Sequence, residues 1–235
     1  MQSIRTFFVN ELKNWKLWEW LFLAISCLAI VVISFISGDT LLGVISSTTG
    51  VAYTVCNGKG KRIAYIFGLI NSILYAYISF NSQIYGDAAL YGLYYVPAMF
   101  VGFFAWKSKM DNTTFEVKKK VLNFKSKIAL ILICLTGTII LGIILKFFTD
   151  DALPFIDAFT TFASIVATIL AIKRYNEQWF LWTCVNAVEV ILWTIRAFQG
   201  AENSIISLVM WTIFLIIGII MWIRWSNQIK KSKSI

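Results

Sequence analysis

Long apolar runs, separated by short polar or basic segments, fill most of this chain. An α-helix needs about 20 mainly apolar residues to cross a bilayer, and the runs approach or reach that length. The pattern therefore predicts an all-α membrane protein with eight transmembrane helices. Their expected positions are residues 20–37, 41–56, 63–80, 88–106, 128–148, 155–172, 179–198 and 205–225.

The first 19 residues have a different pattern. Aromatic residues and leucines alternate there with Arg5, Lys13 and Lys16, as in a helix that lies in the membrane interface. A full-length apolar run follows directly, whereas a cleavable signal peptide has a short apolar region and a cleavage site. We therefore expect an interfacial lead-in and no cleaved leader. Pro97, inside the fourth run, is expected to kink that helix.

Composition supports the membrane assignment and excludes several kinds of chemistry. Hydrophobic residues make up 59% of the chain, charged residues 14%, and the mean hydropathy is +0.75. There is no histidine and no P-loop motif, so histidine-based zinc sites, Ser-His-Asp triads and P-loop ATP hydrolysis are excluded. The four cysteines are isolated and are interpreted as small apolar residues. We expect no enzyme activity, catalytic residue, cofactor or metal site.

The basic residues predict the topology. The net charge is +9, but these charges lie between apolar runs, which argues against nucleic acid as a partner. With eight spans, all but two of the 21 Lys and Arg residues fall on one side, and the exceptions are Lys146 and Arg196. Cytoplasmic loops are rich in Lys and Arg. A multi-pass protein of the cell membrane with both termini in the cytoplasm is therefore predicted.

Two parts of the chain look like copies of each other. In each, a span rich in Ser and Thr leads to a basic loop, and the next span carries an asparagine about ten residues further on, Asn71 or Asn186. At 1.5 Å per residue both asparagines would lie near the bilayer midplane. Each copy closes with a span containing Gly-x-x-x-Trp, at Gly102 and at Gly218.

This repetition predicts a 1 + 3 + 1 + 3 arrangement, in which a connector helix joins two parallel three-helix bundles. Transporters built from such repeats bind substrate at the repeat interface near the midplane. The expected divisions are an N-terminal segment with the first helix (1–40), the first bundle (41–106), a basic loop with the connector helix (107–154), the second bundle (155–226) and a basic tail (227–235).

The seventh span carries the candidate binding site. Trp179, Trp182, Asn186 and Glu189 are spaced to share one helix face. Indoles can stack on a flat ring, the amide and carboxylate can bind polar groups, and polar residues at membrane depth usually mark a substrate path. Asn71 and Tyr75, on the third span, are further candidates.

Each candidate also has a structural interpretation. The two tryptophans fit an interfacial aromatic belt. Both asparagines fit amides that join packed helices. Glu189 could pair with Arg196, and Tyr75 fits a packing residue equally well. A nucleophile–base pair with catalytic spacing is missing from the sequence, and every lysine lies at a helix end or in a loop, which disfavours an enzyme and a retinal protein.

Several short motifs resemble the PnuC family of nicotinamide riboside transporters over nearly the whole chain. The most specific is Trp179-x-x-Trp182-x-x-x-Asn186. The others are Tyr65-Ile66-Phe67-Gly68-Leu69-Ile70-Asn71, Gln83-Ile84-Tyr85, Leu153-Pro154-Phe155-Ile156-Asp157 and Ser164-Ile165-Val166-Ala167. The chain departs from the family pattern in two places: Tyr91 and Gly92 stand where a glutamine is common early in the fourth span, and Glu189 stands where an uncharged residue is expected.

The resemblance implies uptake of nicotinamide riboside, an NAD precursor, by facilitated diffusion with alternating access. It also implies a homotrimer and a functional link to a cytoplasmic kinase that phosphorylates the nucleoside. Related transporters carry thiamine, riboflavin or deoxynucleosides, so uptake of another vitamin or nucleoside is the alternative.

Overall fold

The computed structural model describes residues 4–36, 38, 40–81, 85–150, 153–200 and 204–233. These residues form helices joined by short connections, with two isolated β-bridges among them. Seven of the helical segments are long and apolar enough to cross a membrane. They are Leu17–Ile36, Ile63–Asn81, Asp87–Lys107, Phe124–Phe148, Pro154–Ile172, Glu177–Phe198 and Leu208–Ser232. The prediction of an all-α, multi-pass membrane protein is confirmed.

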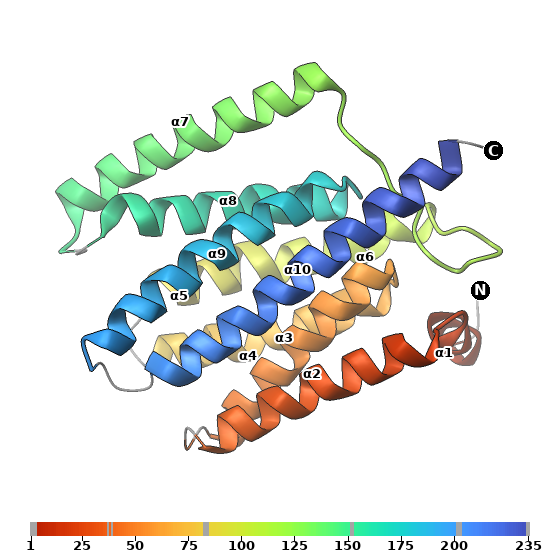
Figure 1. Ribbon diagram of the computed structural model, residues 1–235, viewed down its shortest axis with the longest axis horizontal. Helices are drawn as coiled ribbons and strands as arrows, with labels where there is room; N and C mark the ends of the chain where they lie inside the picture. The colour runs from red at the N-terminus through yellow and green to blue at the C-terminus, as the bar shows by residue number, and fades with distance from the viewer. Residues whose placement is uncertain are drawn as a thin grey trace. The chain divides into compact units, whose positions relative to one another are not determined.

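The chain divides into two compact units, residues 1–118 and 119–235, at the basic loop that was expected to separate the halves. In the first unit α3 packs against both α2 and α4, and α4 also packs against α6 (Figure 1). Its elements are α1 (Ile4–Leu12), α2 (Leu17–Ile36), α3 (Leu41–Lys59), α4 (Ile63–Asn81), α5 (Tyr85–Ala89), the π-helix η1 (Leu90–Tyr95) and α6 (Val96–Lys107).

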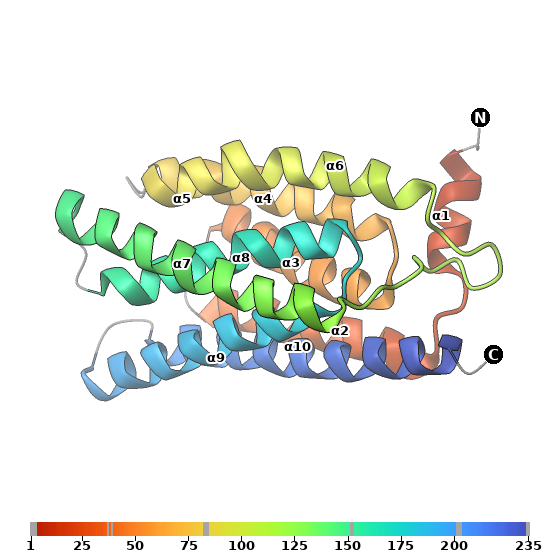
Figure 2. The ribbon, with the colours of Figure 1, turned by 90° about the horizontal axis from the view of Figure 1, so that it is seen from above.

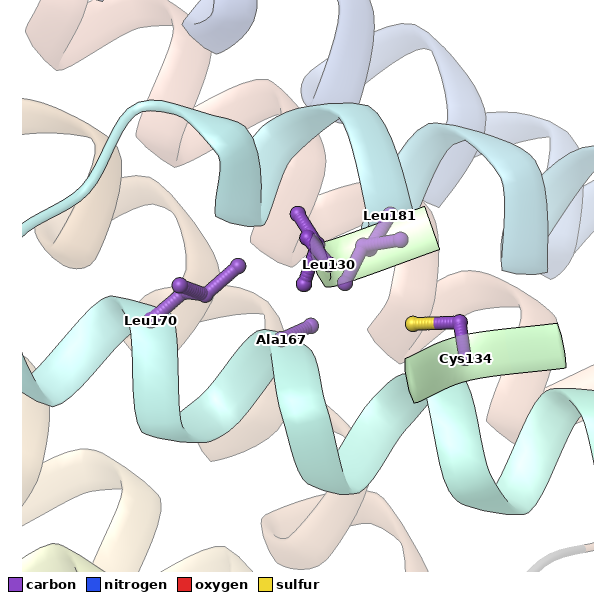
Figure 3. Packing of buried hydrophobic residues seen from close by; sticks show 5 residues of the cluster. All are labelled: Leu130, Cys134, Ala167, Leu170 and Leu181. Atoms are coloured by element: carbon purple, nitrogen blue, oxygen red, sulfur yellow. The ribbon is translucent and has the colours of Figure 1, made fainter. Parts of the chain in front are cut away.

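The second unit consists of four long helices, each packed against the next in sequence. They are α7 (Phe124–Phe148), α8 (Pro154–Ile172), α9 (Glu177–Phe198) and α10 (Ser204–Lys233). A small apolar cluster joins the first half of α7, the end of α8 and the start of α9. Figure 3 shows its members converging: Leu130, Cys134, Ala167, Leu170 and Leu181.

The second expected span is present as the helix α3, but α3 is not among the seven apolar segments. Its serines, threonines and glycines lower its hydropathy, although it has 19 residues. The Thr40 side chain caps it by accepting a hydrogen bond from the Gly43 N–H at 3.2 Å. Small residues let neighbouring helices approach closely in lipid.

The fourth expected span is built from three helical pieces. Figure 2 shows α5, η1 and α6 running as one rod. Within it the Val96 N–H donates to the Tyr91 carbonyl, five residues back, which is the π-helical pattern. Pro97 follows directly in the first turn of α6, where its missing N–H is tolerated. The irregularity expected at Pro97 is therefore a π-helical turn that precedes it.

The two largest differences from the expected boundaries are at the end of α10 and the start of α7. The helix α10 continues to Lys233, so residues 227–233 of the expected tail extend the last helix. The apolar pattern ends at residue 225 because a helix that leaves the membrane no longer needs apolar residues. The helix α7 begins at Phe124, where the Asn123 side chain accepts from the Ser126 N–H at 2.8 Å.

The helices α3 and α8 end in the same kind of turn. In the first unit the N–H groups of Gly60 and Lys61 donate to the carbonyls of Asn57 and Cys56. In the second unit those of Arg174 and Tyr175 donate to Ala171 and Leu170. Both are Schellman motifs, which place one residue in the left-handed region. That residue is Gly60, with φ of 83°, in the first turn and Arg174, with φ of 66°, in the second.

The basic turn after α3, expected as a short cytoplasmic loop, has its Lys and Arg side chains buried. Lys61 has no exposed surface, and burial lowers its pKa to about 8. Its ammonium donates to three carbonyls: Asn10 at 3.2 Å, Lys13 at 2.9 Å and Phe115 at 2.8 Å. A buried ammonium needs such partners, because taking it out of water costs several kcal/mol.

The N-terminal helix α1, expected to lie in the membrane interface, is tied to this turn. The Glu11 carboxylate accepts from the Ile63 N–H at 3.1 Å, at the start of α4. Burial raises the pKa of the Glu11 carboxyl, against the effect of that hydrogen bond and of the nearby Lys61. The Lys59 ammonium completes the cluster, 2.6 Å from Glu19 and 3.1 Å from Glu116.

Gly102 lies where α6 packs against the buried ring of Tyr65, and a Cβ at Gly102 would overlap that ring. We expect Gly102→Ala to destabilise the protein by about 1–3 kcal/mol. The matched control is Gly92→Ala, because a Cβ there would meet only Ala76, at 3.8 Å. Thermal unfolding in detergent should separate the two variants, and equal melting temperatures would contradict the close packing of α4 on α6.

Glu11 can be tested with two substitutions that separate its charge from its acceptor oxygen. Glu11→Gln keeps an acceptor for the Ile63 N–H and removes a charge that burial disfavours. Its free energy of unfolding should therefore lie within about 1 kcal/mol of the wild-type value. Glu11→Ala leaves the N–H unpaired and should cost about 1–3 kcal/mol. Alanine also favours helices, so a loss would not reflect helix propensity. Equal stability of the Gln and Ala variants would remove the capping role.

Candidate substrate-binding site

The helix α9 carries most of the residues expected to bind substrate, and its first tryptophan is in the core. Trp179 has no exposed surface. Its ring meets Trp225 edge-on, with centroids 6.0 Å apart. The first unit has a similar contact, with Tyr65 and Trp106 edge-on at 5.0 Å. Trp179 is therefore a packing residue between α9 and α10, and it is not an exposed residue of an aromatic belt.

The second tryptophan, Trp182, has different neighbours. It is half-buried and packs against the apolar cluster that joins α7, α8 and α9. Leu181 belongs to that cluster and lies beside it in sequence. The spacing places the two indoles on one face of α9, but their neighbours differ. Trp179 contacts α10, and Trp182 packs on the cluster that includes α7 and α8.

Asn186 is the most unusual polar residue of the second unit. It is only 6% exposed, yet within the described part of the chain its amide makes no hydrogen bond. The helix α10 approaches it at a glycine: a Cβ on Gly218 would lie 3.7 Å from Asn186 Nδ2 and 3.3 Å from Thr183 Oγ1. The amide nitrogen and oxygen nevertheless keep some accessible surface, so a ligand can reach them and supply hydrogen bonds.

Asn71 lies in a different environment. Its Nδ2 donates to the Ser46 carbonyl at 2.8 Å and approaches the Ser46 hydroxyl at 3.3 Å. Gly50 makes room for it, since a Cβ there would lie 3.0 Å from Nδ2. These contacts join α4 to α3, which is the packing interpretation of this asparagine.

The two asparagines do not occupy equivalent positions relative to the turns that precede them. Asn71 lies 11 residues after the left-handed Gly60, and Asn186 lies 12 residues after Arg174. The residue equivalent to Asn186 is therefore the buried Ser72. One residue turns a helix by about 100°, which explains why Asn71 faces α3 and Asn186 faces α10.

The remaining candidates, Glu189 and Tyr75, are both half-buried. Glu189 lies about one turn beyond Asn186 on α9. Tyr75 donates to Asp87 Oδ2 at 3.4 Å and packs on Tyr91, with ring centroids 4.3 Å apart. Sequence reasoning missed Asp87 as a partner of Tyr75. The nearby run of tyrosines before Pro97 was a signal that could have indicated it.

The arrangement on α9 provides hydrogen bonding and an aromatic surface. No group of three or more Cys, Asp or Glu residues within the described ranges could hold a metal ion. An amide both donates and accepts, and Thr183, beside it, has a hydroxyl that already donates to the Trp179 carbonyl at 2.7 Å. These are the groups that bind an uncharged polar or hydroxyl-bearing molecule.

Comparison with known proteins assigns the chain to a family. A family model described as "Nicotinamide mononucleotide transporter" matches residues 40–227. The chain belongs to this family. The resemblance seen in the Trp-x-x-Trp and asparagine motif is thereby confirmed.

Relatives in this transporter family match over most of their length. The nicotinamide riboside transporter PnuC of Neisseria mucosa is 35% identical over 218 residues, covering 90% of this chain and 81% of the relative. The protein of the same name from Haemophilus influenzae is 30% identical over 222 residues, 94% of each chain. The crystal structure of the vitamin B3 transporter PnuC is 33% identical, with a TM-score of 0.81, and covers 97% of this chain and 99% of that chain.

The two asparagines should respond differently to alanine in the ligand-free protein. Asn71→Ala removes a bond between helices and should cost about 1 kcal/mol. Asn186→Ala removes an amide that makes no hydrogen bond to another described residue and should leave stability nearly unchanged. Thermal unfolding in detergent measures both. A large loss of stability in Asn186→Ala would show that this amide is structural.

Proposed function

We propose that this protein carries nicotinamide riboside across the cell membrane by facilitated diffusion with alternating access. Two relatives that bear this substrate in their name match at least nine-tenths of the chain. The observation that carries the placement of the site is Asn186, a residue only 6% exposed whose amide keeps accessible surface and makes no hydrogen bond to another described residue.

The chemistry of nicotinamide riboside suits these residues. Its pyridinium ring is flat and positively charged, and its carboxamide and ribose hydroxyls both donate and accept hydrogen bonds. Asn186 binds one of these polar groups, and Trp182 provides the ring face. Cation–π attraction to an indole contributes about 0.5–2 kcal/mol. Glu189, about one turn away, offsets the positive charge of the ring in a site with little water.

The other candidates have supporting roles in this proposal. Trp179 packs against Trp225 and holds α9 against α10. Asn71 joins α3 to α4 through Ser46. Tyr75, with Asp87, provides a polar group in the first unit that the substrate meets during passage.

We further propose eight spans in a 1 + 3 + 1 + 3 order, in which α3 crosses the membrane in addition to the seven apolar segments. Both termini then lie in the cytoplasm. The matching left-handed turns after α3 and α8 support two parallel three-helix repeats. The family resemblance supports a homotrimer, and light scattering of the purified protein tests that assembly. A cytoplasmic kinase that phosphorylates the nucleoside would then retain it in the cell.

Binding is tested by calorimetry on purified protein with nicotinamide riboside, thiamine, riboflavin and deoxynucleosides. We expect nicotinamide riboside to bind, and Trp182→Leu, which keeps apolar packing but removes the ring face, to weaken binding by at least about tenfold. Asn186→Ala should abolish measurable binding. Trp193→Leu, on the same helix, is the matched control. Preference for thiamine or a deoxynucleoside would replace the proposed substrate.

Transport itself is measured in liposomes that contain the protein and no kinase. Labelled nicotinamide riboside should equilibrate to equal concentrations inside and outside, and an uncoupler should have no effect. Accumulation above the external concentration, lost on adding the uncoupler, would instead indicate ion coupling.

A further inference from the structure

The second unit contains a cavity that the proposed transport site does not use. It has a volume of about 470 Å³, within the range of ligand pockets. Its lining residues come from the start of α7, the start of α9 and the end of α10. Trp182 and Asn186 are not among its lining residues.

Two lysines on different helices line this cavity. Lys127 comes from α7 and Lys230 from α10. The one carboxylate in the lining, Glu177, already accepts the Leu122 N–H at 3.1 Å and the Lys127 ammonium at 3.2 Å. An ammonium has three donors, so Lys127 keeps donors for a ligand, and the two lysines outweigh the single carboxylate. The cavity therefore favours an anion.

A buried amide and a hydroxyl stand beside the lysines. Asn176 is 7% exposed, and its Nδ2 donates to Ser226 Oγ at 2.9 Å. Its Oδ1 is buried and accepts no hydrogen bond within the described residues. Asn176 Oδ1 can accept from a hydroxyl group, and the Ser226 O–H can donate to one. This pair is suited to a ligand that carries hydroxyls next to its anionic group.

The remaining wall is apolar. Phe180 and Trp222 meet edge-on with ring centroids 5.5 Å apart, and Phe180 is 40% exposed. Ile131, one turn beyond Lys127 on α7, is 53% exposed and also lines the cavity. A water-soluble phosphate ester would leave this wall uncovered, whereas a lipid chain would cover it.

We propose that this cavity binds one anionic glycerophospholipid with a hydroxyl-bearing headgroup, of the phosphatidylglycerol type. The phosphate lies between Lys127 and Lys230, and a headgroup hydroxyl meets Asn176 and Ser226. The glycerol end and first part of an acyl chain lie on Phe180 and Trp222. Lysines at the end of a membrane span are positioned for such a headgroup.

The test is native mass spectrometry of the full-length protein with equimolar phosphatidylglycerol and phosphatidylcholine. Wild type should retain phosphatidylglycerol selectively. Lys127→Gln/Lys230→Gln should lower that preference by about tenfold or more, and the double arginine variant should keep it. The matched control is Lys125→Gln/Lys231→Gln, which removes equal charge from the same helix ends outside the lining and should leave the preference unchanged.

Two further measurements test the headgroup hydroxyl contact and the need for a lipid. Ser226→Ala keeps both lysines and should lower retention of phosphatidylglycerol several-fold, and it serves alone if the double glutamine variant does not fold. Inorganic phosphate and a nucleoside monophosphate, each at millimolar concentration, should not displace the lipid. Unchanged lipid preference in both the double glutamine variant and Ser226→Ala, or full displacement by either soluble phosphate, would overturn the proposal. These measurements use no transported substrate, so they are independent of the proposed transport function.

Discussion

The first unit depends on the hydrogen bonds that the buried Lys61 ammonium makes to carbonyl oxygens in place of water. Its ammonium is completely buried and is balanced by three carbonyls, which belong to the N-terminal segment and to the loop before Val117. Removing a charge from water costs several kcal/mol unless its donors are satisfied. The turn, the N-terminal segment and the loop can therefore form only together. The same loop donates the Val117 N–H to the Gly60 carbonyl, which fixes where α4 begins.

The second unit fixes the start of α9 by similar means but without a buried lysine. Its turn has Arg174 in the left-handed region, a conformation that is unfavourable for a residue with a side chain. Backbone bonds hold it: the Lys120 N–H donates to the Arg174 carbonyl, and the Asn176 N–H donates to the Lys120 carbonyl. Glu177 then accepts the Leu122 N–H. In both units the basic loop is thus a structural part of the helix start.

Sequence reasoning located the membrane helices because their apolar runs are a property of composition and length. It did not find the end of α10, since a helix that leaves the bilayer changes residue type without changing conformation. It also could not show that the lysines at 57–62 are buried, because a lysine pattern does not reveal whether carbonyls surround the ammonium groups. Gly60 was a visible sign of a left-handed turn, whereas Arg174 gave no such sign.

The asparagines show the same limit and carry a functional consequence. A pattern of one asparagine about ten residues after a loop cannot resolve one residue of register, yet one residue is about 100° around a helix. That difference sends Asn71 to Ser46, where its Nδ2 donates to a carbonyl, and places Asn186 beside Gly218, where its amide makes no hydrogen bond to another described residue. An asparagine held like Asn71 has its amide nitrogen engaged in helix packing and less able to bind a substrate. The departure from exact repetition is therefore what gives the second unit a candidate binding site, because the Asn186 amide keeps donors and an acceptor that a ligand can use.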